Sequence, residues 1–479
     1  MAKSPNILWI CTDQQRMDTL GCYGNQYVKT PNLDKLASSG VMFNHAYCQN
    51  PVCAPSRASF ITGRYPSTTK CRQNGQMISK DEIPVTRILR DAGYNCGLAG
   101  KLHIAPCNPS VCNVMEERID DGYAVFNWSH GSPAKHVNND YHVWLRSEGQ
   151  EFTSQPFENS NQVEIGMPEK YHQSTWCTNK AIDFISANAA QDKPWLFSYH
   201  CFDPHHPFDP PIEYLERYLT KLDELPLPNY KKGEQETKGQ FQQNDYENGA
   251  YNHMKKLRSK DMSEKDHRLV KAAYYAMVDL VDRQLGRLFD SLESLGQLDN
   301  TIIIFHSDHG ELLGDHGMYL KGPHLYDCSV RVPLIISWPN KIKATVTDTM
   351  VELVDIAPTI LEAVGLPKEP GMQGKSLWSL LTGETDTHRQ DAMCECYNSM
   401  VHHKNPSPYV TMLRTHDYKL IAHHGQNFGE LYDMKNDPGE TTNLWDNPQY
   451  TSERFILMQR LCDRLAFNCD PLPIRAAGY

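Results

Sequence analysis

TIIIFHSDHG, the ten residues at positions 301–310, carries the clearest indication of the fold. Its first half is an uninterrupted apolar run rich in β-branched side chains, which is typical of a strand buried on both faces of a parallel sheet. Asp308 and His309 follow at the C-terminal end of that run. Because open α/β sheets bind ligands at the carboxyl ends of their strands, these two side chains are candidates for a ligand site.

Three further runs repeat this arrangement, at residues 6–12, 94–99 and 195–199. Each is short, apolar and β-prone, as expected for a buried strand. The side chains that follow can carry charge or bind a ligand: Asp13 and Gln14 after the first run, Lys101 and His103 after the second, and His205 after the third. Four such strands predict an α/β domain with one site at the carboxyl edge of its sheet.

Helical patterns lie between the strands. Ser263 and Asp266 have the spacing of a capping box, and apolar residues at helical intervals continue from about residue 269 to 292. A second helix is predicted over residues 355–364. Residues 225–261 are polar with little periodicity, and they predict either a specificity element near the mouth of the site or a plain surface loop.

The pattern changes near residue 374, after which short strands alternate with turns. This change predicts a small antiparallel sheet packed beside the main domain. A single hydrophobic core usually stops growing at about 250–300 residues, and the chain has 479. We therefore expect a main α/β domain over residues 1–373 and a smaller C-terminal α+β subdomain over residues 374–479.

Composition excludes several classes of protein. The chain is 40% hydrophobic and 22% charged, and no apolar run approaches the roughly 20 residues that cross a bilayer, so no membrane partner is expected. A formal net charge of -11 argues against nucleic acid as a partner. It does not argue against a small anionic substrate, which needs only local positive charge.

The N-terminal and cysteine patterns leave alternatives open. The apolar stretch at residues 7–11 is too short for a signal-peptide core, so we expect either a cytoplasmic protein or one whose signal was removed. The fifteen cysteines have no tight repeated spacing and no zinc-ribbon pattern. Most are expected to be reduced, and the candidates for a disulfide are Cys96, Cys107 and Cys112.

The most specific local pattern is CAPSR at residues 53–57, continued by TGR at residues 62–64. Pro55 suits the first turn of a helix, so Cys53 is expected just before a helix N-terminus. Free N–H groups and the helix dipole favour an anion at that position. A lone cysteine there would otherwise be interpreted as a buried free thiol.

This pattern resembles the C-x-P-S-R motif, with its downstream T-G-R, of the formylglycine-dependent (type I) sulfatases in the alkaline-phosphatase-like superfamily. The resemblance extends over nearly the whole chain. It implies a large mixed, mostly parallel sheet flanked by helices, and sulfuric ester hydrolase activity. It also implies that a formylglycine-generating enzyme oxidises Cys53 to formylglycine, whose hydrated aldehyde attacks sulfur with one hydroxyl and expels sulfate with the other.

The resemblance also implies one divalent metal ion. The family places D-D, D-Q or D-N at one strand end and D-N or D-H at another. The predicted ligands that match are Asp13, Gln14, Asp308 and His309, together with the modified Cys53. The family expectation is Ca²⁺, which suits the oxygen-rich donors as Mg²⁺ does, and the imidazole leaves Mn²⁺ open. Gln in place of a second acid lowers the negative charge of the site.

The predicted catalytic residues combine this nucleophile with cationic and acid–base groups. They are Cys53, Arg57, Lys101 and His103 (the family's G-K-x-H), His205 (P-H-x-P) and Lys321 (the lysine before Y-E/D…V-P-L). Arg57 and the two lysines would neutralise the sulfuryl oxygens. His205 or His103 would protonate the leaving alkoxide, and His309 would pair with the formylglycine hydroxyl or the metal. Because Lys321 lies one residue further from Tyr326 than in several family members, His324 is a predicted substrate contact.

We therefore expect hydrolysis of a sulfate ester, on a small molecule or oligosaccharide and most simply on a sulfated carbohydrate. The main alternative is a phosphonate monoester or phosphodiester hydrolase of the same superfamily. A non-catalytic sulfate- or glycan-binding relative is the third, and it is disfavoured because no nucleophile or ligand is missing. Specificity is expected on residues 105–165 and 225–262, which carry no readable code.

Overall fold

The computed structural model describes residues 4–158 and 160–477. Its largest element is a nine-stranded sheet whose strands follow the order β11-β2-β10-β8-β1-β7-β3-β4, with β9 paired to β2. Their bounds are β1 Asn6–Thr12, β2 Val41–Tyr47, β3 Asn95–Gly100, β4 Val125–Trp128, β7 Trp195–His200, β8 Thr301–Ser307, β9 Arg331–Val332, β10 Leu334–Ser337 and β11 Thr345–Glu352. Only β9 and β10 pair antiparallel with their neighbours, so the predicted mixed, mostly parallel sheet is confirmed.

The four strands predicted from the sequence lie side by side at the centre of this sheet, in the order β8-β1-β7-β3. They are parallel and in register: Cys11 near the end of β1 pairs with His306 on one side and His200 on the other. His200 in turn pairs with Gly100 at the end of β3. The residues that follow all four strands therefore lie at the same edge of the sheet.

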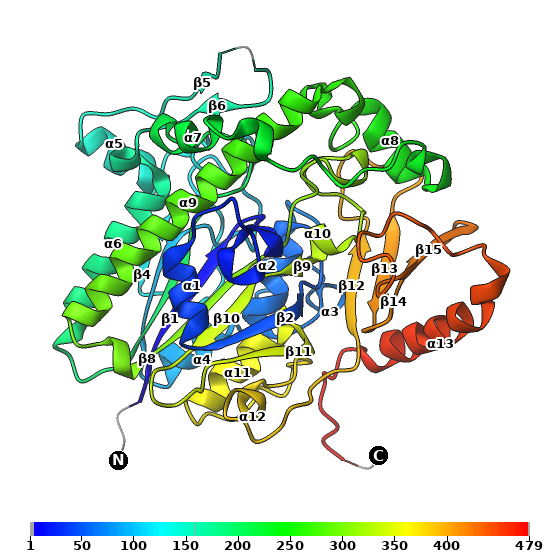
Figure 1. The fold of residues 1–479 in the computed structure, drawn as a ribbon. Helices are drawn as coiled ribbons and strands as arrows, with labels where there is room; N and C mark the ends of the chain where they lie inside the picture. Colours follow the sequence, from blue (N-terminus) through cyan, green and yellow to red (C-terminus); the bar gives the residue numbers. More distant parts are fainter. Residues whose placement is uncertain (1–3, 159, 478–479) are drawn as a thin grey trace.

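Helices cover both faces of the sheet, because its strands are apolar on both. Along β1, Ile7, Trp9 and Cys11 pack into one hydrophobic cluster and Leu8 and Ile10 into another. The first cluster includes α2 Cys53–Thr62, α4 Val85–Asp91 and α11 Ile356–Ala363. The second includes α1 Pro31–Ser38, α6 Gln173–Ala189, α7 Ile212–Leu219 and α9 Glu264–Ser294. Figure 1 shows α9 running the length of the domain.

Two predicted helices are confirmed with small shifts at their ends. The capping box of α9 is present: Ser263 Oγ accepts from the Asp266 N–H, and the Asp266 carboxylate accepts from the Ser263 N–H. The helix begins at once after this cap rather than at residue 269. Helix α11 follows a 3₁₀ turn over residues 353–355, so it starts at Ile356.

A second, antiparallel sheet follows in the C-terminal part of the chain, as predicted, in the order β12-β13-β14-β15. Its strands are β12 Ala392–Tyr397, β13 Tyr409–Arg414, β14 Tyr418–His423 and β15 Phe428–Asp433. Helix α13, Thr451–Phe467, packs against it (Figure 1, orange and red). Arg464 of α13 pairs with the buried Glu352 of β11 at 2.8 Å, so the helix that packs against the small sheet is also joined to the large one. The division of the chain at residue 373 stays a prediction.

Residues 225–261 contain more structure than their sequence indicates, including α8 Gln240–Asn248. This segment contacts the C-terminal sheet directly. The buried Lys238 ammonium donates to the Tyr432 hydroxyl at 2.8 Å, and Gln242 Nε2 donates to Glu430 Oε1 at 2.7 Å. The remaining short elements are α3 Pro66–Thr69, α5 Asp140–Ser147, α10 Asp327–Val330, α12 Trp378–Leu381, β5 Gln155–Pro156 and β6 Glu164–Ile165.

All fifteen cysteines are free thiols, so the alternative of a disulfide among Cys96, Cys107 and Cys112 was wrong and the expectation of reduced cysteines is confirmed. Most are buried, and burial protects a thiol from oxidation. Across residues 4–158 and 160–477, we find no helix that combines the length and hydrophobicity required to span a bilayer.

Candidate active site

Cys53 is the first residue of α2, directly after the extended Val52. All ten residues of this helix are buried, and Pro55 is tolerated in its first turn because the N–H groups there have no partner within the helix. Asn74 Oδ1 accepts one of those free N–H groups, from Ala54, at 3.0 Å. Ser56 Oγ donates to the Asp308 carbonyl at 2.6 Å. The helix is thus fixed against the end of β8, and it begins at Cys53 itself, one residue earlier than the sequence predicts.

The residues predicted at the strand ends do gather around the Cys53 thiol. Its Sγ lies 3.6 Å from Asp13 Oδ1, after β1, and 3.2 Å from His309 Nε2, after β8. The Lys321 ammonium lies 2.9 Å from the same sulfur. Lys101, after β3, reaches the group through Asp13, with 2.5 Å between Nζ and Oδ2.

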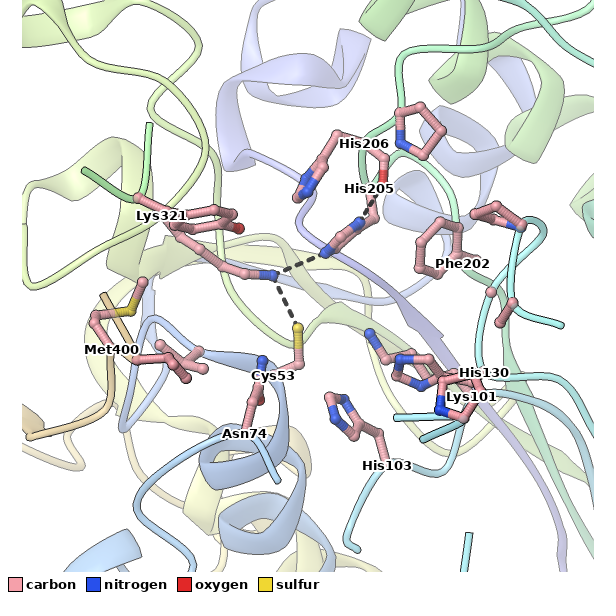
Figure 2. Close-up of a pocket in the computed structure, with 18 of the residues that line it drawn as sticks. Cys53, Asn74, Lys101, His103, His130, Phe202, His205, His206, Lys321 and Met400 are labelled. Atoms are coloured by element: carbon pink, nitrogen blue, oxygen red, sulfur yellow. Dashed lines mark hydrogen bonds between the residues drawn. The ribbon is translucent and has the colours of Figure 1, made fainter. Parts of the chain in front are cut away.

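Lys321 connects several of these side chains. Besides the sulfur of Cys53, its ammonium is 2.7 Å from Gln14 Oε1, 2.9 Å from His205 Nε2 and 3.3 Å from His309 Nε2. Figure 2 shows Lys321 and His205 on one side of Cys53, with His103 and Lys101 on the other. Lys321, which was predicted by resemblance despite its longer spacing to Tyr326, therefore lies at the centre of the site.

Arg57 lies below the site rather than in it. Its guanidinium is 1% exposed, donates to Asp308 Oδ2 at 2.8 Å and to the Lys101 carbonyl at 2.6 Å, and does not line the cavity. It therefore fixes the positions of Asp308 and Lys101 by a charge-assisted contact. Its predicted part in neutralising the sulfuryl oxygens stays a prediction.

The charges around Cys53 favour an anion at its sulfur. Burial and the neighbouring Asp13 both raise the pKa of this thiol. Lys101, Lys321 and His309 outweigh them, so its pKa lies well below the usual value. For Asp13, burial raises the pKa, but Lys101 and other cations hold it well below its usual range. A negative group at the N-terminus of α2 is therefore stabilised by several fixed cations.

The surroundings of the two candidate acid–base histidines favour their neutral forms. Burial lowers the pKa of His205 well below its usual value, and the nearby Lys321 lowers it further. Burial and Lys101 have the same effect on His103. His309 differs: burial lowers its pKa, but the adjacent Asp308 carboxylate more than compensates, so its pKa is raised.

Two residues of this site have a strained backbone. Gln14 has a φ of 64° and His103 a φ of 57°, in the left-handed region that non-glycine residues rarely adopt. Each such conformation costs on the order of 1–3 kcal/mol and persists where surrounding contacts enforce it. At Gln14 those contacts are the Asp308 carboxylate, which accepts its N–H at 3.0 Å, and Tyr274, which donates to its carbonyl.

A cavity of about 830 Å³ opens above Cys53, large enough for a small organic ester (Figure 2). Of the predicted residues, Cys53, Lys101, His103, His205 and Lys321 line it. Its wall also includes side chains that sequence reasoning missed: Asn74, His130, Phe202, His206, Tyr251 and residues 399–402. Among the residues that the structure describes, no aspartate or glutamate lines it. The cavity is thus lined by cations, imidazoles and apolar groups, a composition that suits an anionic ligand.

Tyr251 decides between the two interpretations of residues 225–261. It lies three residues beyond α8 and lines the cavity, and its ring centroid is 5.9 Å from that of His206. The segment is therefore part of the cavity wall and not a plain surface loop.

His324 was predicted to contact substrate, but its imidazole is fully buried and is not among the residues that line the cavity. Its Nε2 lies 2.7 Å from Asp245 Oδ2, and the other carboxylate oxygen of Asp245 lies 2.9 Å from His403 Nε2. The three residues belong to segments that carry Lys321, Tyr251 and His402 respectively to the cavity. We therefore assign His324 a positioning role, in a buried cluster that holds these three segments together.

Four of the buried donors could hold a divalent cation. One donor atom each from Asp13, Cys53, Asp308 and His309 lies within 4.8 Å of the others, and Gln14 Oε1 approaches the same centre next to Lys321. Two adjacent buried carboxylates and an amide oxygen are the hard donors that Ca²⁺ or Mg²⁺ prefers. The residues present therefore fit the predicted metal.

Comparison with known proteins gives two family models that match the chain. One, described as Sulfatase, matches residues 5–366, and the other, described as N-sulphoglucosamine sulphohydrolase, C-terminal, matches residues 314–466. An uncharacterised sulfatase of Escherichia coli (strain K12) is 30% identical over 484 residues, which cover 98% of this chain and 88% of that protein.

Two solved structures share the fold over almost their whole length. One is a protein in complex with its substrate D-glucosamine-2-N,6-O-disulfate, with 26% identity, a TM-score of 0.79 and coverage of 99% of this chain and 100% of that one. The other is a phosphonate monoester hydrolase of Agrobacterium radiobacter, with 25% identity, a TM-score of 0.81 and coverage of 97% and 96%. The backbone alone therefore does not distinguish sulfate from phosphonate chemistry.

The cluster at Asp245 gives a prediction for dynamics. Replacing Asp245 by Ala leaves two buried imidazoles without their acceptor, so residues 240–257 and 398–404 should exchange backbone hydrogens faster in hydrogen–deuterium exchange. Asp245→Asn should exchange at an intermediate rate, since a carboxamide can still accept from one imidazole. Glu247→Ala, which changes an exposed residue of the same helix, is the control. Unchanged exchange in Asp245→Ala would contradict the positioning role.

Proposed function

Because the chain belongs to the sulfatase family, we propose that it hydrolyses the sulfate ester of a carbohydrate, through a formylglycine made from Cys53 and one bound divalent cation. As a sulfatase it is a sulfuric ester hydrolase. The observation that carries the finer proposal is the position of Cys53 Sγ on the cavity floor, within 2.9 Å of the Lys321 ammonium and 3.2 Å of His309 Nε2. That sulfur stands in for the oxygens of the hydrated aldehyde.

The modified residue would supply one hydroxyl that attacks sulfur and a second that releases sulfate, and the cation would polarise a sulfuryl oxygen. The chain's own residues bind and orient the ester. Lys101 and Lys321 line the cavity on opposite sides of Cys53, so a sulfate group above Cys53 lies between two ammonium groups (Figure 2). Such fixed charges stabilise the additional negative charge of the transition state.

His205 is the residue we assign to protonation of the leaving alkoxide. It lines the cavity, burial and Lys321 hold its pKa well below the usual value, and its Nε2 accepts from the Lys321 ammonium at 2.9 Å. The imidazole, once it has taken up a proton from solvent, would donate it to the leaving oxygen, while the Lys321 ammonium keeps its charge. His309 Nε2, at 3.2 Å from Cys53 Sγ, would pair either with the formylglycine hydroxyl or with the cation.

The proposal of a sulfated carbohydrate rests on two findings. The solved neighbour binds a disulfated glucosamine, and the C-terminal family model is named for an N-sulphoglucosamine sulphohydrolase. The imidazoles of His130, His206 and His402 and the hydroxyl of Tyr251 give the cavity groups that can hydrogen bond to sugar hydroxyls. A formylglycine-generating enzyme is the maturation partner that this mechanism requires.

The nucleophile is tested by mass and by substitution. Conversion of Cys53 should lower the intact mass of the chain by the difference between a CH₂–SH and a CHO group. Cys53→Ala should abolish turnover and leave the melting temperature nearly unchanged, because only a small group at the start of α2 is lost. Cys462→Ala, an exposed thiol on α13, is the matched control and should retain full activity. Turnover by Cys53→Ala would reject the proposed nucleophile.

The charge-stabilising role of Lys101 predicts a loss of rate. Lys101→Ala should lower kcat by about 10²–10³-fold, the effect of removing one preorganised stabilising group. Lys135→Ala removes an exposed lysine from the outer wall of the same cavity and should leave kcat near that of the parent protein. Equal kcat values for the two variants would place the reacting sulfate away from Lys101.

The substrate class is tested by a direct competition. Sulfated mono- and oligosaccharides, an aryl sulfate and a phosphate diester are assayed side by side, and free sulfate or product alcohol is measured. We expect kcat/KM to be greatest for a sulfated sugar. A higher kcat/KM for the phosphate diester would overturn the assignment in favour of the phosphonate and phosphodiester hydrolases.

A further inference from the structure

A second group of metal-binding side chains lies in the wall of the cavity, separate from the donors around Asp13. It consists of His103, Cys107 and His130, whose donor atoms all lie within 4.8 Å of one another. The strands explain why they meet. Gly100 at the end of β3 pairs with Trp128 at the end of β4, and His103 and His130 follow these two residues. Cys107 lies four residues beyond His103, in the loop that connects β3 to β4.

His103 and Cys107 are buried, His130 is half-buried, and both imidazoles have a nitrogen available for a ligand. His103 is 4% exposed and Cys107 is 6% exposed. Within the described part of the chain, the Nδ1 atoms of His103 and His130 are buried and have no hydrogen-bond partner, and the two ring centroids are 4.5 Å apart. A buried imidazole nitrogen without a partner loses its hydration and gains nothing in return, unless a ligand completes it.

Glu116 fixes the loop that carries the cluster. Its carboxylate accepts the backbone N–H of His103 at 2.9 Å, the Trp128 indole N–H at 2.8 Å and the Cys107 thiol at 3.3 Å. Cys107 and His103 are therefore held in place before any ligand arrives. Such a buried partner orients metal ligands in known sites and supplies negative charge next to the ion.

From this geometry we propose that His103, Cys107 and His130 form a site for a thiophilic divalent ion such as Zn²⁺ or Co²⁺. One thiolate and two imidazoles suit these ions and not Ca²⁺ or Mg²⁺. Binding converts the Cys107 thiol to a thiolate and releases its proton to solvent. Three protein ligands leave one coordination position, which faces the cavity because His103 and His130 both line it.

Occupation of this site inhibits the enzyme, because a His103 imidazole bound to the metal is no longer free to hydrogen bond to an ester in the cavity that it lines. This second part rests on the proposed function, whereas metal binding itself does not. The proposal differs from the predicted Ca²⁺ site in its ligands, in its preferred ion and in its effect on the rate.

The test uses Co²⁺ as a spectroscopic probe, with the protein first saturated with Ca²⁺. The parent protein should show a near-ultraviolet band from thiolate-to-cobalt charge transfer. Cys107→Ser and Cys107→Ala should lose the part of this band that Cys107 contributes. Cys112→Ser, which removes the other thiol of the same loop, should keep it. Cys53 is common to all variants, so the parent-minus-variant difference isolates Cys107.

Inhibition is measured separately with Zn²⁺ on the sulfatase assay. Cys107→Ser should retain its basal rate and need at least about 10-fold more Zn²⁺ for half inhibition, since even a disturbed outer-shell partner weakens metal binding by that factor. Parent and Cys112→Ser should respond alike. A cobalt band as intense in both Cys107 variants as in the parent protein would overturn the site, whether or not sulfatase activity is found. A normal band loss with unchanged Zn²⁺ inhibition would overturn the inhibitory role alone.

Discussion

Two carboxylates, Asp13 and Asp308, are buried completely at the ends of the neighbouring strands β1 and β8, and the architecture around them answers that constraint. Like charges this close in a weakly polarisable interior are costly unless cations are held beside them. Arg57 approaches from α2, Lys101 from β3 and Lys321 from the loop before α10. The position of Cys53 is a consequence, since α2 carries Arg57 and begins at the point where these charges meet.

The residues at the strand ends form the floor of the cavity. They could be predicted from the sequence because their positions follow from short-range rules. Each buried strand ends where a polar residue begins, parallel strands bring those ends together, and the C-x-P-S-R pattern identifies the helix between them. The positions of Asp13, His309 and Lys101 could be expected from these facts alone. The role of Arg57 could not, because an arginine in this motif fits a substrate contact and a buried support equally well until its burial is known.

The wall of the cavity was less predictable. Tyr251 and the residues around Met400 come from segments without periodicity that are far apart in the chain, and these segments meet through the contact between Asp245 and His403. His324 shows the same limit. His324 lies three residues from Lys321 in the sequence, and a substrate contact was predicted for it. Its imidazole instead contacts the buried Asp245. Sequence spacing gives the strand ends but not the direction of side chains in irregular loops.

The cavity is built from two sources, a floor set by strand ends and a wall supplied by insertions and by the C-terminal sheet. The reacting groups are held by the central strands, which have little freedom to vary, whereas residues 399–402 stand on a loop between β12 and β13. A change confined to these loops would therefore alter the shape and polarity of the cavity while the charges around Cys53 keep their positions.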